Sequence, residues 1–332
     1  MDEIPVQAAE LKPMSLSELL DRTFTLYRNR FWLFCGLMVM PEIAILLCSL
    51  IVIVAFPITN VPTAVANPAN PFAALGAIWS RLAATFVAGF VQALFGALAL
   101  GAVTVAVSDL YMGRTATIRG SYAAVRSRLF GLFGLILMLM LVGIAFFTAG
   151  SFAGGFAGGL IMVATAMISP VIGVIFLFLL IFAGVVGAFW LLMRFAVSIP
   201  AFMLEQRGVI DSMSRSGALT QGHRNRIFVT VIVMYVVLLV FQLGLALPFF
   251  ILQSSYQAKG LLPLWVQIGQ AVSAAVASTI AGPLLMIAIA LIYYDVRIRK
   301  EGFDLESMMN ALKPSTEAGG NTGAPPPLQS AS

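Results

Sequence analysis

The amino-acid sequence predicts an all-α membrane protein with about six transmembrane helices. Hydrophobic residues make up 60% of its 332 residues and charged residues only 10%, whereas soluble domains hold about 25% charged residues. Mean hydropathy is +0.99, and charge-free apolar runs recur along the whole chain. The longest run, 129–193, has room for two spans and a turn, because one span needs roughly 20 residues.

Basic residues predict how these spans are oriented. With the N-terminus placed in the cytoplasm, the inner segments hold 16 of the 19 Lys and Arg residues, which is the excess expected of short cytoplasmic loops. Both termini are therefore predicted to be cytoplasmic, in agreement with an even number of spans. The net charge of +5 then reflects topology and contacts with anionic lipid headgroups at the cytoplasmic face, and no nucleic-acid partner is expected.

The chain divides into a flexible N-terminus (1–14), a membrane domain (15–313) and a disordered cytoplasmic tail (314–332) rich in Pro, Gly, Ala and Ser. Ser15 and Glu18 form a predicted capping box at the start of an amphipathic helix. This helix is expected to lie in the inner membrane interface. The alternative is an ordinary cytoplasmic helix that packs on its neighbours.

The same plan recurs twice downstream. Polar segments lead into apolar runs at three junctions spaced 98 residues apart, which are Arg30-Phe31, Arg128-Leu129 and Arg226-Ile227. Because similarity at a fixed period is a strong fold signal, we expect three parallel repeats of one interfacial helix and one two-helix hairpin. Their bounds are about 15–112, 113–207 and 208–301, and a short cytoplasmic helix follows. We predict a compact bundle with pseudo-threefold character.

A glycine-rich block lies inside the second repeat. Gly150, Gly154 and Gly158 recur every four residues, a spacing that suits a close-packing helix face. About 20 apolar residues precede the block, which is the length of one span. An outer turn or helix end is therefore favoured over a packing face.

The sequence offers little for catalysis. The single histidine, His223, lies in a basic segment and is interpreted as a solvated loop residue. No Cys, His and carboxylate spacing matches a metal site, the glycine-rich block lacks the Lys-Ser/Thr of a phosphate loop, and no cofactor is predicted. Cys35 and Cys48 share one span, 13 residues apart, so no disulfide is expected between them. The protein is expected not to be an enzyme.

Charge inside the membrane is the stronger signal. Glu42 lies 12 residues past Arg30, and Arg194 lies 11 residues before Glu205, so at 1.5 Å per residue both are roughly 16–18 Å deep. Since a lone charge there costs at least about 2.5–3.5 kcal/mol, Glu42 and Arg194 are predicted to form an ion pair. The pair is either a structural bridge or a polar site for a headgroup, an ion or a proton. In a further alternative, Arg194 extends to the interface.

Prolines interrupt three predicted spans, at Pro41, Pro200 and Pro283. Each removes a backbone hydrogen bond and is expected to kink its helix. Pro41 directly precedes Glu42, so this carboxylate is predicted to lie beside a disrupted turn of backbone. The other two repeats have Leu-Met and Val-Leu at the corresponding place, which makes the first repeat the place to look for function.

Three segments resemble a known bacterial family: SLSELLDRTFTLYRNRFW (15–32), RFAVSIPAFMLEQRGVIDSMSRSGALTQGHRNR (194–226) and LIYYDVRIRKEGFDLE (291–306). They are similar to the glycerophosphoryl diester phosphodiesterase membrane domain family, a domain that precedes some of these enzymes and also occurs alone in bacterial multi-pass proteins. The catalytic barrel would bring a His-Arg-Gly motif and a second histidine, whereas His223-Arg224 is followed here by Asn225. The resemblance implies the membrane domain without the hydrolase, in a bacterial inner (plasma) membrane.

These observations favour a non-enzymatic scaffold or accessory factor of the inner membrane, which acts on the membrane or on a protein partner. The alternative is a transporter or lipid-handling protein with its polar site at Glu42 and Arg194. A third interpretation, a phosphodiesterase, would require metal-dependent hydrolysis by the purified protein.

Overall fold

A computed structural model describes residues 14–55, 71–165, 169–257 and 263–302. Most of the predicted flexible N-terminus (1–14), the predicted short helix after 302 and the predicted tail (314–332) lie outside the described residues. The described part is helical, without a strand, and contains six helices long and apolar enough to cross a membrane. The predicted fold class, an all-α membrane protein with six spans, is confirmed for this part of the chain.

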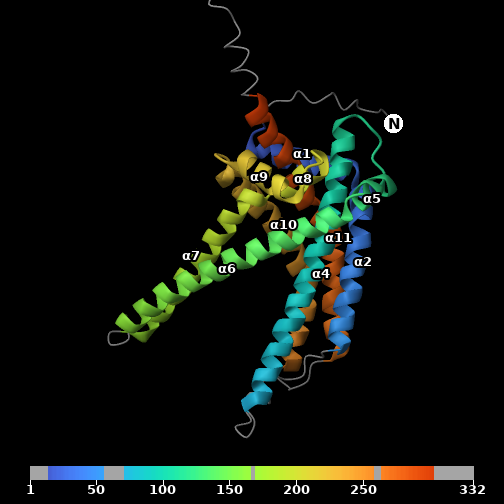
Figure 1. Ribbon diagram of the computed structural model, residues 1–332. Helices are drawn as coiled ribbons and strands as arrows, with labels where there is room; N and C mark the ends of the chain where they lie inside the picture. Colours follow the sequence, from blue (N-terminus) through green and yellow to red (C-terminus); the bar gives the residue numbers. More distant parts are fainter. Residues whose placement is uncertain (1–13, 56–70, 166–168, 258–262, 303–332) are drawn as a thin grey trace, which may run out of the picture.

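Six long helices carry the spans: α2 (Phe31–Ala55), α4 (Pro71–Tyr111), α6 (Leu129–Thr165), α7 (Pro170–Leu192), α10 (Arg224–Gln257) and α11 (Leu264–Arg297). Shorter elements gather at one end of the molecule (Figure 1). They are α1 (Leu16–Asn29), α5 (Ile118–Arg126), the 3-10 turn η1 (Met193–Phe195), α8 (Ser198–Leu204), α9 (Val209–Thr220) and the π-helical turn η2 (Ile298–Gly302). We call these six short elements the collar.

The first collar helix begins as its sequence predicts. The Ser15 hydroxyl accepts a hydrogen bond from the Glu18 backbone N–H, and the Glu18 carboxylate accepts one from the Ser15 N–H, so the capping box is confirmed. Leu19 and Thr23 are buried, because α1 packs on α11 and α10. Its place in the membrane interface stays a prediction.

The apolar core lies next to the collar. Helix α11 is its centre, in contact with α1, α2, α4 and α10, and its residues from Leu284 to Val296 contribute much of the buried cluster. Past Pro41 in α2 and past Met234 in α10, no described residue is buried. The remaining length of these helices presents apolar side chains outward, as contact with lipid requires.

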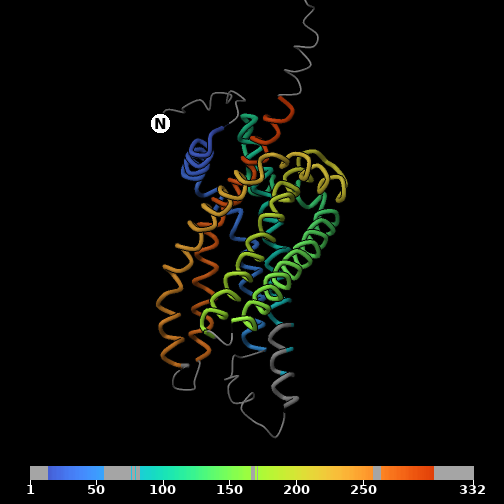
Figure 2. Tube along the Cα trace, turned by 90° about the vertical axis from the view of Figure 1, so that its left-hand side faces the viewer, coloured from blue at the N-terminus to red at the C-terminus, as the bar shows by residue number. Residues whose placement is uncertain are grey.

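The arrangement of the hairpins corrects the prediction of a compact pseudo-threefold bundle. Helices α2, α4, α10 and α11 run in one general direction away from the collar (Figures 1 and 2). The α6–α7 hairpin diverges from them toward its loop, as Figure 1 shows. Buried apolar residues of α6 such as Leu132 and Leu135 lie in its collar-side end. The hairpin therefore meets the other helices near the collar and is otherwise held by its own interface.

That interface depends on the glycine-rich block, and the predicted outer turn there is wrong. Gly150, Gly154 and Gly158 lie inside α6 and face α7, and the chain turns later, after Thr165. A Cβ at Gly154 would overlap the Leu180 carbonyl oxygen, and one at Gly184 would overlap the Gly150 carbonyl oxygen. The two backbones are in direct contact, which is the packing role of small residues between membrane helices.

The element order agrees with the predicted plan. A short helix precedes each hairpin: α1 before α2 and α4, α5 before α6 and α7, and α9 before α10 and α11. Similarity between the three units is not established by this order, so the internal repeat stays a prediction.

Candidate functional site

The structure does not bring Glu42 and Arg194 together. Arg194 lies in η1, at the collar, where its backbone carbonyl accepts hydrogen bonds from the hydroxyls of Ser216 and Thr220 of α9. Its guanidinium lies along α9, with Nε 2.8 Å from the position of a Cβ on Gly217. The predicted depth was wrong because α7 ends at Leu192, so a rise of 1.5 Å per residue does not continue to Glu205.

Pro200 also differs from its predicted role. The spanning helix breaks at η1, and Pro200 is the third residue of the short helix α8. The N–H groups of a first helical turn have no partner within the helix, so a proline there costs little. Pro200 therefore lies in the first turn of a short helix, whereas Pro41 and Pro283 lie inside α2 and α11 as predicted.

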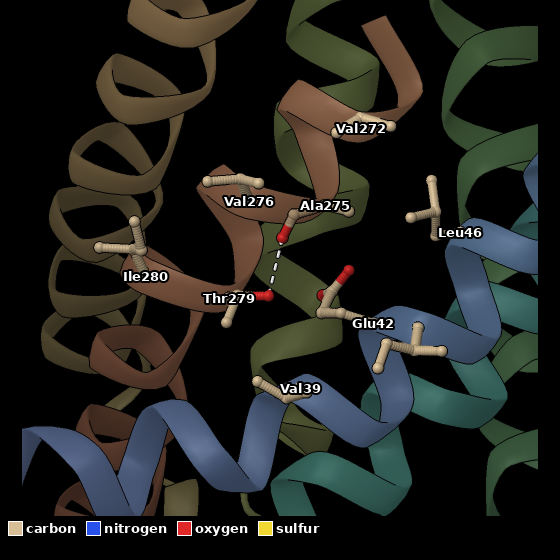
Figure 3. A pocket seen from close by; sticks show the side chains of 9 residues that line it. Val39, Glu42, Leu46, Val272, Ala275, Val276, Thr279 and Ile280 are labelled. Carbon is tan, nitrogen blue, oxygen red and sulfur yellow. Dashed lines mark hydrogen bonds between the residues drawn. The ribbon is translucent and has the colours of Figure 1, made fainter. Parts of the chain in front are cut away.

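Glu42 lines a groove between α2 and α11 (Figure 3). The groove has a volume of about 230 Å³, and its other lining residues are Val39, Ile43, Leu46, Val272, Ala275, Val276, Thr279 and Ile280. The Thr279 hydroxyl donates to the Ala275 carbonyl oxygen at 2.8 Å. Among the described residues, Glu42 has no ion-pair or hydrogen-bond partner for its side chain. Its carboxyl group is the uncommitted polar group of an otherwise aliphatic groove.

The turn before Glu42 is completed by the collar. Pro41 has no N–H, so the Leu37 carbonyl loses its usual partner four residues later. The Tyr122 hydroxyl of α5 donates to this carbonyl, and burial raises the pKa of Tyr122 to about 12, which keeps the hydroxyl protonated. Tyr27 of α1 likewise donates its hydroxyl to a carbonyl of a spanning helix, that of Ile280 in α11.

A double-mutant cycle tests this role of Tyr122. Tyr122→Phe is expected to lower the free energy of unfolding by about 1–3 kcal/mol, because it leaves a buried carbonyl without a donor. In a Pro41→Ala background the new alanine supplies an N–H to the Leu37 carbonyl, so the same substitution should cost markedly less. Unfolding in detergent or bicelles measures both values, with Tyr235→Phe, an exposed tyrosine of α10, as the control. Equal costs of Tyr122→Phe in the two backgrounds would contradict the assignment.

A carboxylate cluster joins the ends of α8, α9 and α11. The Glu205 side chain is only 8% exposed and pairs with Arg207 (2.6 Å) and Arg215 (3.0 Å), and Tyr293 donates its hydroxyl to the same carboxylate at 2.9 Å. Arg215 also pairs with Glu301, which Arg297 holds at 2.7 Å. These contacts fix the collar-side end of α11 against α8 and α9.

This cluster predicts a loss of stability in acid. Burial by itself would raise the pKa of Glu205, but the hydrogen bonds from Arg215 and Tyr293 and the attraction of Arg215 outweigh it and hold the pKa below its ordinary value of 4.5. Since the folded pKa is depressed, the stabilisation is complete above pH 4.5 and is lost as the pH falls through the folded value. Glu205→Gln should therefore be less stable than the wild type at pH 6. Between pH 6 and pH 3 its melting temperature should fall less than that of the wild type. Parallel pH profiles would exclude this contribution.

A second cluster fixes the start of the described chain. The Asp295 side chain is 3% exposed and pairs with Arg299 at 3.0 Å and Arg226 at 3.4 Å. It also accepts a hydrogen bond from the Met14 N–H at 2.8 Å, while both arginines donate to the Met14 carbonyl. The ends of α10 and α11 thus hold the segment that leads into α1.

A cleft of the collar lies between α1 and the ends of α4 and α11. It has a volume of about 380 Å³ and presents both signs of charge; its lining residues are Glu18, Asp21, Arg22, Thr25, Leu26, Asn29, Arg30, Leu110, Tyr111 and Leu291. We call it the α1 cleft. Arg22 pairs with Glu18 at 2.9 Å. The cleft thus combines the polar face of α1 with apolar and aromatic residues of the spans.

Arg30 differs from the other two junction arginines. Arg128 donates to the Phe202 carbonyl and lies over the Phe202 ring, and Arg226 binds Asp295 and the Met14 carbonyl. Within the described residues, the guanidinium of Arg30 and the carboxylate of Asp21 have no protein partner. Both line the α1 cleft, which leaves a cation and an anion available to a ligand.

His223 and the two cysteines belong to no metal-binding cluster among the described residues. His223 is half-buried in the turn that precedes α10, and burial together with the positive charge of the nearby Arg299 lowers its pKa. Cys35 and Cys48 are free thiols. The described residues contain no group of three or more His, Cys, Asp and Glu side chains that could hold a metal ion.

The sequence indicated the junctions but not the partners of these charges. Arg30 was predicted only as a span junction, Glu205 only marked the end of a span, and Asp295 was only part of the segment 291–306. A usable signal was the alternation of charge in Tyr293-Tyr294-Asp295-Val296-Arg297-Ile298-Arg299, since residues four apart share a helix face. The pairing of that face with α8, α9 and Met14 depends on long-range packing and could not be read from it.

Comparisons with known proteins give one match. A family model described as a domain of unknown function, DUF7847, matches residues 36–296. The matched segment begins inside α2 and ends inside α11, so it contains the Glu42 groove, Glu205 and Asp295 but omits α1. Neither the curated proteins nor the solved structures contain a match to the chain.

Proposed function

The chain belongs to the DUF7847 family, of unknown function, and on this premise we propose that it is a non-enzymatic scaffold or accessory factor that holds a phospholipid headgroup in its collar. The α1 cleft carries the proposal. It offers an unpaired guanidinium, Arg30, for a phosphate and an unpaired carboxylate, Asp21, for an ammonium group. An Arg–phosphate contact is a strong, charge-assisted hydrogen bond.

The surroundings of the α1 cleft fit a lipid rather than a soluble phosphate. The side chain of Trp32, two residues past Arg30, is 84% exposed, and that of Phe24 is 42% exposed. Aromatic residues of this kind are typical of the membrane interface. The acyl chains of a phospholipid would extend along the exposed apolar part of α2, so headgroup and chains would each meet a matching surface.

The proposed orientation in the membrane is based on the distribution of basic residues in the sequence. The collar faces the cytoplasm of a bacterial inner membrane, because the segments that form it hold most of the Lys and Arg residues. The similarity to the glycerophosphoryl diester phosphodiesterase membrane domain supports the same setting and a role without hydrolysis. The transporter alternative loses its expected site, since Glu42 and Arg194 do not pair, and the collar becomes the surface that binds lipid and a protein partner.

Native mass spectrometry of the protein from nanodiscs of phosphatidylethanolamine and phosphatidylglycerol tests the proposal. The wild type should retain phospholipid, and the double variant Asp21→Asn/Arg30→Gln should lose at least about tenfold of the bound fraction, as expected when about 1.4 kcal/mol or more of binding free energy is removed. Arg28→Gln, which changes an exposed arginine of α1 outside the cleft, is the matched control. Equal retention by all three proteins would refute the headgroup site.

A further inference from the structure

We propose that Glu42 and the groove around it bind a lipophilic organic cation that enters from the bilayer. This site is independent of the α1 cleft, lies deeper in the membrane and goes beyond the proposed function. Glu42 is 11 residues past the start of α2, which places it roughly 16 Å along the helix. Three properties of the groove point to such a ligand. Its one acid has no partner among the described residues, its walls are aliphatic, and it opens to lipid.

The Glu42 carboxyl group has no hydrogen-bond or ion-pair partner among the described residues. Figure 3 shows the Glu42 carboxyl group between α2 and α11, with the Thr279 hydroxyl bound to the Ala275 carbonyl of its own helix. A carboxylate near the middle of a membrane costs at least about 2.5–3.5 kcal/mol without a partner. Because Arg194 lies at the collar, the compensating charge must be a proton or a cation from outside the chain.

The walls exclude small inorganic cations. Ca²⁺ takes 6–8 oxygen ligands and Mg²⁺ takes six, but Glu42 is the one carboxylate in the groove, and the other side chains except Thr279 are aliphatic. Such walls favour a ligand whose positive charge is surrounded by carbon, such as a tertiary or quaternary amine or a phosphonium ion. The attraction between this charge and Glu42 would be strengthened by the low dielectric constant of the site.

The opening faces lipid. Four wall residues are exposed by 39–52%: Val39, Ile43, Val272 and Val276. The groove holds about 230 Å³, so it would take the charged part of an organic cation while the apolar remainder stays in contact with lipid. Entry from the bilayer therefore needs no aqueous path.

Binding exchanges one proton for one cation. The protonated Glu42 carboxyl loses its proton to solvent, and the resulting carboxylate pairs with the cation, so the net charge of the groove does not change. No other lining residue is titratable. Among the described parts of the helices packed on α2, α4 has no charged or titratable side chain from Ala83 to Ser108, and α11 has none from Leu264 to Ile292. Within α2 the nearest titratable side chains are those of Cys35 and Cys48. The charged and titratable side chains of α1 and α5 lie at the collar.

Equilibrium dialysis of tetraphenylphosphonium against the full chain in nanodiscs tests the proposal. Saturable binding is expected, with an affinity that rises by up to about tenfold per pH unit while Glu42 is protonated, since one proton is released. Glu42→Gln should lose at least about tenfold in affinity, whereas Ser49→Ala, which removes a hydroxyl of α2 outside the groove, should bind as the wild type does. Uptake that does not saturate, or that is unchanged in Glu42→Gln, would overturn the proposal.

Labelling of the wild type gives a readout that does not depend on folding of a variant. Dicyclohexylcarbodiimide, an apolar reagent, should modify the protonated Glu42, as peptide mass spectrometry detects, and tetraphenylphosphonium should protect it. Failure of the cation to protect Glu42 would contradict the site. If the chain instead forms a dimer that Glu42→Gln dissociates and the cation does not bind, the groove is an interface between two copies and the proposal is wrong. Loss of headgroup binding in the Asp21/Arg30 variant leaves both experiments unaffected.

Discussion

Gly154→Ala is expected to separate α6 from α7 and to lower the thermal stability of the protein strongly. The added Cβ would overlap the Leu180 carbonyl oxygen and lie 2.8 Å from the Ile181 Cα. Both are backbone atoms, so no side-chain rotation relieves the contact and the helices must move apart. Overpacking of this kind costs about 1–3 kcal/mol, and the diverging hairpin has few other contacts to compensate.

Two neighbouring glycines supply matched controls. A Cβ at Gly159 would meet nothing within 4 Å, and one at Gly155 would meet only the Ile181 side chain at 3.9 Å. Alanine is about 1 kcal/mol more favourable than glycine inside a helix, so Gly159→Ala and Gly155→Ala should be as stable as the wild type or more stable. The melting temperature in detergent, measured by loss of the monodisperse peak after heating, compares the three variants. The same melting temperature for all three would show that the α6–α7 contact is not close.

Asp295→Asn is expected to have the second large effect, a loss of about 3 kcal/mol or more in the free energy of unfolding. Removing one partner of a buried ion pair leaves the other charge uncompensated, and such changes cost about 3–5 kcal/mol. Here two arginines, Arg226 and Arg299, lose their counter-charge, and the Met14 N–H loses a charged acceptor.

The effect on Met14 separates this prediction from a general loss of stability. Hydrogen exchange at the start of α1 should accelerate in Asp295→Asn even under conditions in which the spans stay protected, because this cluster holds the segment. Asp211→Asn removes an exposed carboxylate in the first turn of α9 and should change stability by about 1 kcal/mol at most. If Asp295→Asn resembles Asp211→Asn in both measurements, the cluster does not hold the N-terminal segment.

The Glu205 cluster and the Asp295 cluster hold different parts of the collar on α11. Glu205 ties α8 and α9 to Tyr293, while Asp295, two residues further along α11, ties the start of α1 to α11. The α1 cleft lies beside the second cluster, with Leu291 in its wall. A substitution at Asp295 should therefore weaken headgroup binding indirectly, whereas Glu205→Gln should leave it unchanged.

The spans could be predicted because each depends on local composition. A run of about 20 apolar residues must form a helix in lipid, where every backbone N–H and C=O needs a partner within its own segment. The capping box at Ser15 is local in the same sense, since its two hydrogen bonds join residues three apart. Pro41 and Pro283 were likewise placed inside spans by their position in apolar runs.

The site could be predicted only in part. The sequence singled out Glu42 as an unusual intramembrane acid, and the structure places it in a groove with an uncommitted carboxyl group. The partner was wrong because the depth of Arg194 was inferred from a continuous helix, and the break at η1 moves Arg194 to the collar. Apolar composition does not reveal such a break, since Leu191, Leu192 and Met193 fit either conformation.

The sequence by itself thus determined the helical class, the six spans, the three junction arginines and the presence of an acid, Glu42, inside a span. All of these follow from the energetics of single segments in a bilayer. Only the tertiary structure decided that Gly150, Gly154 and Gly158 join α6 to α7 and that this hairpin diverges from the rest. It also decided that Arg128 and Arg226 are bound, while Arg30 has no partner among the described residues. These outcomes depend on which surfaces meet. In lipid, apolar side chains gain little by burial against each other, so close backbone contacts and buried charges select the arrangement.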